Sequence, residues 1–211
     1  MLLLENTLQF DFFDSIIYFF KSTGLLEWCG VFTGILCVWL AAKNNIWNWP
    51  IACISVIIYV FIFFEGKLYA DAGLQLYFLA TNIYGWYYWN QQRNNPTQER
   101  PVKNISSKEV ILSIIGIVAF TAILGFTLFH KTDAAFPFID SFCTACSIIA
   151  QIFLARKVIQ NWLIWIFVDV IYVGVYFSKD LAATGMMYML YIGIATMGYI
   201  DWRRIYREQK N

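Results

Sequence analysis

One segment of this chain occurs twice. Residues 27–89 align with residues 140–202 at one constant offset and without a gap. The positions that are identical in the two copies are Ile35/Ile148, Ala42/Ala155, Ile46/Ile159, Asn48/Asn161, Trp49/Trp162, Ile51/Ile164, Ile58/Ile171, Tyr59/Tyr172, Val60/Val173, Phe64/Phe177, Leu68/Leu181, Ala70/Ala183, Gly85/Gly198 and Trp89/Trp202. A duplication of this length predicts two units with the same fold, and a site between them would draw on both copies.

The composition places both copies in a membrane. Of the 211 residues, 60% are hydrophobic and only 14% are charged, and the mean hydropathy is +0.57. Soluble domains usually carry about 25% charged residues. The sequence therefore predicts an integral membrane protein that contacts the lipid bilayer.

Seven apolar runs are each near the length that a helix needs to cross about 30 Å of hydrocarbon. They occupy residues 27–43, 47–64, 70–89, 110–129, 138–156, 160–177 and 183–202. Continuous apolar runs lack the alternation of a barrel strand, and a helix satisfies its own backbone hydrogen bonds in lipid. The expected fold class is therefore all-α, with seven transmembrane helices.

The number of spans predicts how the copies are related. Each copy has three spans, so two copies joined directly would be antiparallel in the membrane. The additional span at 110–129 restores the same direction. We therefore expect a 3+1+3 arrangement with parallel internal repeats.

The segments outside the spans complete the expected organisation. Residues 1–25 contain a short apolar stretch with two carboxylates near its start. We expect a retained N-terminal interfacial helix there, since the chain does not open with the basic region or cleavage site of a signal peptide. The other units are the first three-helix repeat at 26–90, a cytoplasmic linker at 91–109, the linker transmembrane helix at 110–132, the second repeat at 138–203 and a cytoplasmic tail at 204–211.

The basic residues predict the orientation, because cytoplasmic loops retain Lys and Arg. With seven spans, one side holds Lys43, Arg93, Arg100, Lys103, Lys108, Arg156, Lys157, Arg203, Arg204, Arg207 and Lys210. The other side holds Lys21, Lys67, Lys131 and Lys179. This excess places the C-terminus and the linker in the cytoplasm and the N-terminal segment outside.

Little in the sequence suggests catalysis or a metal. Cys143 and Cys146 have the spacing of a redox or metal pair, but they lie in an apolar span and the chain has only 1 His. Packing explains them better. The motifs of zinc proteases, P-loop proteins and serine hydrolases do not occur. We expect no enzyme activity, no cofactor and no metal, and the charges of the linker and tail indicate no nucleic-acid partner.

A polar and aromatic face lies on the sixth span. Trp162, Trp165, Asp169 and Tyr172 recur at spacings of three and four, which places them on one side of a helix. Asp169 falls near the bilayer centre, where a carboxylate costs at least about 2.5 kcal/mol. A structural hydrogen bond or protonation would offset this cost, but no Lys or Arg lies in the interior of a span to pair with it. We therefore predict that this face binds substrate.

Amide side chains on two other spans are further candidates. Gln75 and Asn82 share a face of the third span, and Gln151 lies deep in the fifth. Each carries donors and acceptors that suit hydroxyl or amide groups of a ligand. Each also suits an interhelical hydrogen bond worth about 1 kcal/mol or less.

The Asn-Trp pair that opens the second span of each copy is the last candidate. Asn48-Trp49 recurs as Asn161-Trp162. The Asn suits a helix N-cap and the Trp suits the membrane interface, so a structural role is favoured over ligand contact.

The aromatic content indicates what kind of solute would bind. Aromatic residues make up 19% of the chain, and many lie in span interiors, namely Tyr59, Phe63, Tyr77, Phe78, Trp165, Tyr172, Tyr188 and Tyr191. An aromatic cavity suits a flat ring, and cation–π contacts add about 2 kcal/mol when desolvated. With Asp169 as counter-ion, the pattern indicates a cationic aromatic solute.

Several spaced motifs resemble those of the Pnu-type vitamin transporters. They are Trp47-Asn48-Trp49-Pro50, Lys67-Leu68-Tyr69-Ala70-Asp71 with Leu74-Gln75, Tyr84-Gly85-Trp86-Tyr87-Tyr88-Trp89 and Asn161-Trp162-Leu163-Ile164-Trp165-Ile166 followed by Val168-Asp169. The resemblance covers about 26–204, nearly the whole chain. It implies a fold like the SWEET sugar transporters but with parallel repeats, a substrate site between the repeats near the midplane, and often a homotrimer.

The resemblance also implies a bacterial inner-membrane protein that takes up nicotinamide riboside by facilitated diffusion, with trapping by a cytosolic kinase. Family members of similar sequence carry thiamine or riboflavin. Members specific for nicotinamide riboside carry an Asn four residues after a Trp of the sixth span, whereas this chain carries Asp169 after Trp165. An acid tolerates either cation, nicotinamide riboside or thiamine, and disfavours neutral riboflavin.

We expect the two three-helix units to rock around a central site. The ring would stack on Trp165 and Tyr172 with its cation facing Asp169, while Gln75, Asn82 and Gln151 bind hydroxyl or amide groups. Two alternatives belong to other classes: a non-transporting membrane receptor or assembly subunit, and a SWEET-like sugar carrier.

Overall fold

The computed structural model describes residues 24–65, 69–91, 101–132, 135–179 and 181–210, together with Ile17 and Lys21. Seven long helices account for most of them. These are α2 (Leu25–Ala42), α3 (Asn48–Glu65), α4 (Tyr69–Asn90), α5 (Ser107–Lys131), α6 (Pro137–Ala155), α7 (Asn161–Ser178) and α8 (Ala182–Glu208). The expected N-terminal interfacial helix at 1–25 lies almost entirely outside the described residues.

The helices confirm the all-α fold class and coincide with the seven predicted spans within a few residues. Six of them are long and apolar enough to cross a membrane, which makes the chain a multi-pass membrane protein. The exception is α4, whose polar groups lower its hydropathy, although it has 22 residues. At the C-terminus, α8 continues to Glu208, so much of the expected tail is helical.

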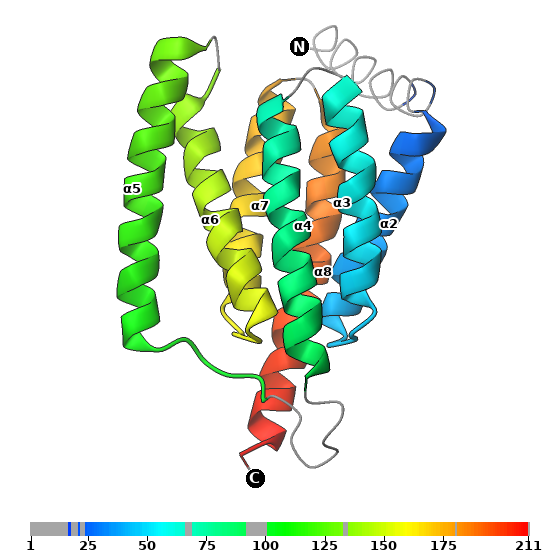
Figure 1. The fold of residues 1–211 in the computed structure, drawn as a ribbon, viewed down its shortest axis with the longest axis vertical. Coiled ribbons are helices and arrows are strands. Elements are labelled where there is room, and N and C mark those ends of the chain that lie inside the picture. The colour runs from blue at the N-terminus through cyan, green and yellow to red at the C-terminus, as the bar shows by residue number, and fades with distance from the viewer. Residues whose placement is uncertain are drawn as a thin grey trace, which may run out of the picture.

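The helices alternate in direction (Figure 1), and their contacts close a ring. The even-numbered helices α2, α4, α6 and α8 run from the upper to the lower end of the view, and α3, α5 and α7 run back. Contacts follow the order α2, α3, α4, α6, α7, α8 and return to α2, while α5 packs on α6. Because α5 stands outside the ring, it leaves large apolar side chains exposed along its length, which is the pattern of a lipid-facing helix.

The two sequence copies have the same local structure at the lower end of the ring. In the loop before α3, Asn44 has a φ of 53°, and its counterpart before α7, Lys157, has a φ of 56°. Asn48 and Asn161 then begin their helices, and each donates a side-chain hydrogen bond to the carbonyl three residues earlier, at 2.6 and 2.7 Å. The amides therefore close the loops, whereas an N-cap would accept bonds from the helix.

A layer of four tryptophans joins the copies at this end. Trp49 packs edge-on against Trp89 with ring centroids 5.3 Å apart, and their counterparts Trp162 and Trp202 do the same at 5.6 Å. Trp89 and Trp202 meet at 6.0 Å between the copies. All four side chains are buried.

Two glycines make room for this layer. A Cβ at Gly85 would lie 2.4 Å from the Trp49 ring, and one at Gly198 would lie 2.7 Å from the Trp162 ring. No other residue fits either position, because any side chain would displace an indole.

Two hydrogen bonds cross between the copies at the same level. The indole nitrogen of Trp89 donates to the Ala155 carbonyl at 3.0 Å, and that of Trp202 donates to the Ala41 carbonyl at 3.1 Å. Each bond runs from the third helix of one copy to the C-terminus of the first helix of the other. The reciprocity indicates an approximate two-fold relation between the copies.

The end of the linker docks against the loop between α6 and α7 of the second copy. Lys103 forms two backbone hydrogen bonds with the loop between α6 and α7. Its N–H donates to the Lys157 carbonyl at 2.9 Å, and its carbonyl accepts from the Ile159 N–H at 3.0 Å. Val102 is 2% exposed and belongs to the core cluster around the tryptophans. Glu109 in the first turn of α5 pairs with Arg156 at 3.1 Å and Lys103 at 3.5 Å. The linker therefore ties α5 to α6 and α7.

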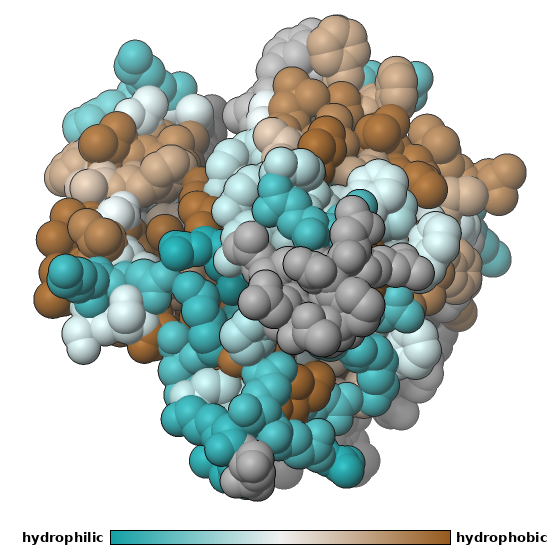
Figure 2. Space-filling view, turned by 60° about the horizontal axis from the view of Figure 1, so that its bottom comes forward, coloured by the Kyte–Doolittle hydropathy of each residue, from teal (hydrophilic) through white to brown (hydrophobic). Residues whose placement is uncertain are grey.

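The surface divides into apolar flanks and a polar end. Figure 2 shows hydrophilic side chains gathered at the lower end of the molecule, where α8 ends, and hydrophobic side chains on the flanks above. The exposed residues of this end include Arg203, Arg204, Arg207 and Lys210. This distribution fits a bundle whose flanks face lipid and whose lower end faces water.

Candidate functional site

The centre of the helix ring holds a cavity of about 330 Å³. Its walls come from all six helices of the ring and from both sequence copies. The lining residues are Gly34, Cys37, Val38 and Ala41 of α2, Asn48, Trp49, Ala52, Ser55, Val56 and Tyr59 of α3, Gln75, Phe78 and Asn82 of α4, Gln151 and Leu154 of α6, Trp162, Trp165 and Asp169 of α7, and Tyr188, Tyr191 and Ala195 of α8. The volume is near the lower end of the range for small-molecule sites.

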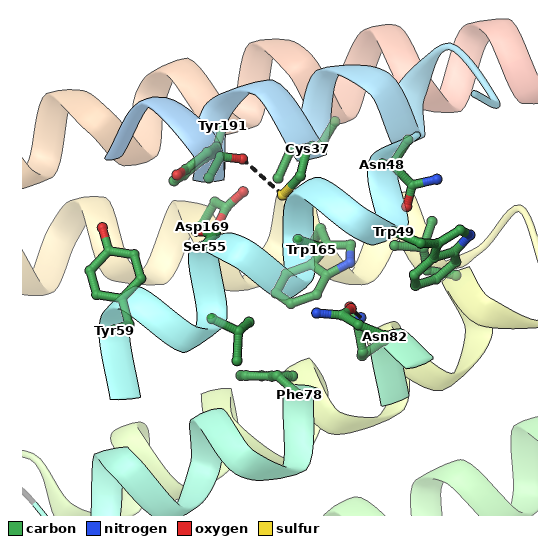
Figure 3. A pocket seen from close by; sticks show the side chains of 18 of the residues that line it. Cys37, Asn48, Trp49, Ser55, Tyr59, Phe78, Asn82, Trp165, Asp169 and Tyr191 are labelled. Atoms are coloured by element: carbon green, nitrogen blue, oxygen red, sulfur yellow. Dashed lines mark hydrogen bonds between the residues drawn. The ribbon is translucent and has the colours of Figure 1, made fainter. Parts of the chain in front are cut away.

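One wall carries a carboxylate and an indole. Trp165 and Asp169 lie one helical turn apart on α7 and both line the cavity. Figure 3 shows Asp169 and Trp165 turned into the space between the helices. Asp169 is 5% exposed, and among the described residues it forms no ion pair. A carboxylate this deeply buried favours a cation in the cavity, because it lacks much of the hydration that a charge has in water.

A second wall carries the two amides. The side-chain nitrogen of Gln151 on α6 donates to the side-chain oxygen of Asn82 on α4 at 2.6 Å, and both residues are buried. The bond therefore crosses between the copies within the cavity wall. Each amide keeps its other polar atom for a ligand, so together they offer one acceptor and one donor. Gln75, which is about two helical turns from Asn82 on α4, also lines the cavity.

The tryptophan layer closes one end of the cavity. Trp49 and Trp162 line it and are 0% and 1% exposed, and Asn48 lies beside them. Both indoles are held in place from behind by the glycines of α4 and α8. These residues therefore have a structural role and also form the cavity floor.

Tyrosines gather toward the other end, and Tyr172 is not in the cavity wall. Tyr59 of α3 lines the cavity, but its counterpart Tyr172 packs against Tyr188 at 5.1 Å and Tyr176 at 5.9 Å. Tyr188 of α8 lines the cavity in its place. Of the face predicted on α7, Trp162, Trp165 and Asp169 line the cavity, whereas Tyr172 packs against Tyr188 of α8.

Three of the aromatic residues that the sequence places in span interiors, Phe78, Tyr188 and Tyr191, line the cavity. Tyr188 and Tyr191 of α8 are the counterparts of Gln75 and Phe78 of α4, so this part of the wall uses equivalent positions of the two copies. Cys37 and Ser55 also line the cavity and were not predicted, and the repeat gives no signal for them, because their counterparts do not line it. Gly34 lets the Tyr191 hydroxyl approach, since a Cβ there would lie 3.3 Å from it.

The described residues hold no group of His, Cys, Asp and Glu that would bind a metal ion. Cys143 and Cys146 are free thiols, 0% and 4% exposed, and pack in a small cluster with Val168. This position agrees with the packing role expected from the sequence.

A ring of apolar helices around an aromatic cavity with one buried acid defines a multi-pass membrane protein that handles a small solute. Comparison with known proteins identifies the group to which it belongs. The model of the family described as nicotinamide mononucleotide transporter matches residues 24–204. The chain therefore belongs to this family, which confirms the resemblance to Pnu-type transporters, and the family consists of membrane transporters and not of enzymes.

Individual relatives agree with this assignment. The nicotinamide riboside transporter PnuC of Escherichia coli (strain K12) is 31% identical, with 87% of each chain covered. The riboflavin/roseoflavin transporter RibM of Streptomyces davaonensis is 25% identical, with 93% of this chain and 90% of the relative covered. The crystal structure of the vitamin B3 transporter PnuC has a TM-score of 0.69 at 24% identity and covers 95% of this chain and 90% of that chain.

Proposed function

We propose that this chain transports nicotinamide riboside across the bacterial inner membrane. The observation that carries the proposal is the buried Asp169, which forms no ion pair with the described residues, beside Trp165 in a cavity that both copies line. Nicotinamide riboside is a flat pyridinium ring with a fixed positive charge, an amide and a sugar. Trp165 supplies a stacking surface, Asp169 a counter-ion, and the pair Asn82 and Gln151 hydrogen-bonding groups.

Thiamine is the alternative substrate within the family. It too is a cationic aromatic, so Asp169 would serve it equally well, and it has no carboxamide to match the two amides. Riboflavin, which the relative RibM carries by name, is neutral and has three fused rings. A buried acid and a cavity of about 330 Å³ favour a smaller cation over it.

We infer a 3+1+3 arrangement in which two parallel three-helix units, α2–α4 and α6–α8, rock about the cavity. The matched loops and the reciprocal bonds of Trp89 and Trp202 support equivalent units, and α5 outside the ring supports a connecting role. The domain limits proposed from the sequence follow the same division. Opening one end would part the tryptophan layer while the tyrosine end closes.

The basic residues place the tryptophan end and the C-terminus in the cytoplasm. In this proposal the protein carries substrate by facilitated diffusion, and a cytosolic kinase traps the product by phosphorylation. A homotrimer is the assembly expected from the family. No cofactor takes part.

Titration calorimetry on detergent-purified protein tests the substrate, with nicotinamide riboside, thiamine and riboflavin compared side by side. We expect the first to bind tightest and Asp169→Asn to weaken binding. Binding tightest to thiamine would move the chain to the thiamine group while keeping the cationic site, and binding to neither cation would refute the proposal.

Proteoliposomes test the mechanism. Substrate should equilibrate without any gradient. Accumulation above the external concentration only under a proton gradient would contradict facilitated diffusion and make Asp169 a proton carrier.

A further inference from the structure

The cavity is built from equivalent positions that carry different chemistry in the two copies. Position 52 of α3 is Ala, and its counterpart in α7 is Trp165. Position 56 is Val, and its counterpart is Asp169. All four residues line the cavity. At these two positions the second copy carries an indole and a carboxylate, whereas the first copy carries small apolar side chains.

The approximate two-fold relation decides where these residues lie relative to one another. It is marked by the reciprocal bonds from Trp89 to Ala155 and from Trp202 to Ala41. In the ring of six helices, α3 and α7 stand three places apart, on opposite sides of the cavity, so equivalent positions on them lie on opposite walls. Ala52 therefore faces Trp165 across the cavity, and Val56 faces Asp169.

A flat ring stacked on Trp165 needs a second wall about 7 Å away, since carbon atoms on each face approach to about 3.5 Å. Ala52 supplies this wall with a single methyl group. A side chain as large as its counterpart would occupy the place of the ring.

We propose that Ala52 is a specificity-determining residue, which sets the width of the slot in which the ring of the substrate stacks on Trp165. The inference rests on the proposed function, since it concerns the ring of the same ligand. Val56 leaves the wall opposite Asp169 apolar, so the cation lies toward α7 and the charge is bound from one side. The slot accepts one flat ring and rejects bulk on the face turned toward α3.

The test exchanges the pair between the copies. Binding of nicotinamide riboside is measured by calorimetry for the wild type, Ala52→Trp, Trp165→Ala and the double variant, each checked for monodispersity. Ala119→Trp serves as the control, because Ala119 is exposed on lipid-facing α5. If Ala52→Trp does not purify as a monodisperse protein, Ala52→Leu replaces it.

We expect Trp165→Ala to weaken binding about 5- to 150-fold, the range for loss of one aromatic stacking partner. Ala52→Trp should abolish detectable binding, whereas the control should bind as the wild type does. The double variant moves the stacking surface to the opposite wall and should bind at least about tenfold more tightly than Ala52→Trp.

The outcomes separate this inference from the proposed function. A wild type that does not bind nicotinamide riboside refutes the function. If the wild type binds nicotinamide riboside and a folded Ala52→Trp or Ala52→Leu variant binds it with the same affinity, the role of Ala52 is refuted and the proposed function stands. A folded double variant that gains nothing over Ala52→Trp also overturns it, because the two positions would then not be opposite walls.

Discussion

Replacing Trp89 and Trp202 by phenylalanine removes the two hydrogen bonds that join the copies at the floor of the cavity. The bonds measure 3.0 and 3.1 Å, and both indoles are buried. Because each bond links the third helix of one copy to the first helix of the other, rocking of the units apart at this end must break both. They therefore stabilise the closed form and leave the open form unaffected.

The size of the effect follows from the number of bonds. A typical buried hydrogen bond contributes about 1 kcal/mol net, so each substitution should shift the equilibrium toward opening about fivefold. The two bonds are equivalent and lie in the same layer, so the double variant should shift it about 30-fold if they add. Phenylalanine keeps an aromatic ring in the layer, which limits the loss of packing.

Cys37 offers a native reporter, because it lines the cavity. The background for the assay replaces the other four cysteines, Cys29, Cys53, Cys143 and Cys146, by Ser or Ala. A membrane-impermeant maleimide is then added from the side on which the tryptophans lie. We expect the labelling rate to rise about 30-fold in the double variant, in proportion to the open population.

Trp47→Phe is the matched control, since Trp47 is 63% exposed near the same end and should leave the rate unchanged. An unchanged rate in the double variant would refute the reasoning. Faster labelling from the opposite side only would show that the bonds hold a different form closed.

Three other predictions concern packing, the amide pair and the linker. Gly85→Ala should destabilise the protein by about 1–3 kcal/mol, because the new Cβ would lie 2.4 Å from the Trp49 ring. The melting temperature of this variant should fall. That of Gly116→Ala should not fall, because nothing lies within 4 Å of a Cβ there. The losses of binding free energy caused by Asn82→Ala and Gln151→Ala, measured by calorimetry, should differ from additivity by about 0.5–3 kcal/mol in the double variant, since either substitution removes the 2.6 Å bond between the two side chains. Additive losses would mean that the two amides bind the ligand separately. Val102→Ala should cost about 1–3 kcal/mol, because Val102 is 2% exposed within the tryptophan core. Val110→Ala, at 37% exposure, should leave the melting temperature unchanged, and an equally small effect of both would mean that the linker does not contribute to the core.

Regular periodicity made some of the site predictable. Trp165 and Asp169 could be placed on one face of α7 from their spacing, and Gln75 and Asn82 on one face of α4, because a helix fixes the angular position of every residue along it. Asp169 was a clear candidate, because a carboxylate within an apolar span carries a large free-energy cost of insertion. Tyr172 has the same spacing and yet lies outside the cavity, since spacing does not say which part of a face a neighbouring helix covers.

The linker shows the same limit from another direction. Its composition indicated a polar connection, but Val102 and Lys103 at its end dock against the loop between α6 and α7. No local sequence pattern predicts such a contact, because it depends on a loop more than fifty residues away in the chain.

The amino-acid sequence by itself determined that the chain is a helical membrane protein, where its spans lie, and that two of its segments fold alike. These properties follow from hydropathy, helical period and repetition, which can be read from short segments or from the comparison of one segment with another. Only the tertiary structure decided that the copies close a ring, that Tyr188 and not Tyr172 lines the cavity, and that Trp89 and Trp202 bond reciprocally across it. Those features depend on which helices become neighbours, and that choice is made by the packing of side chains from distant parts of the chain.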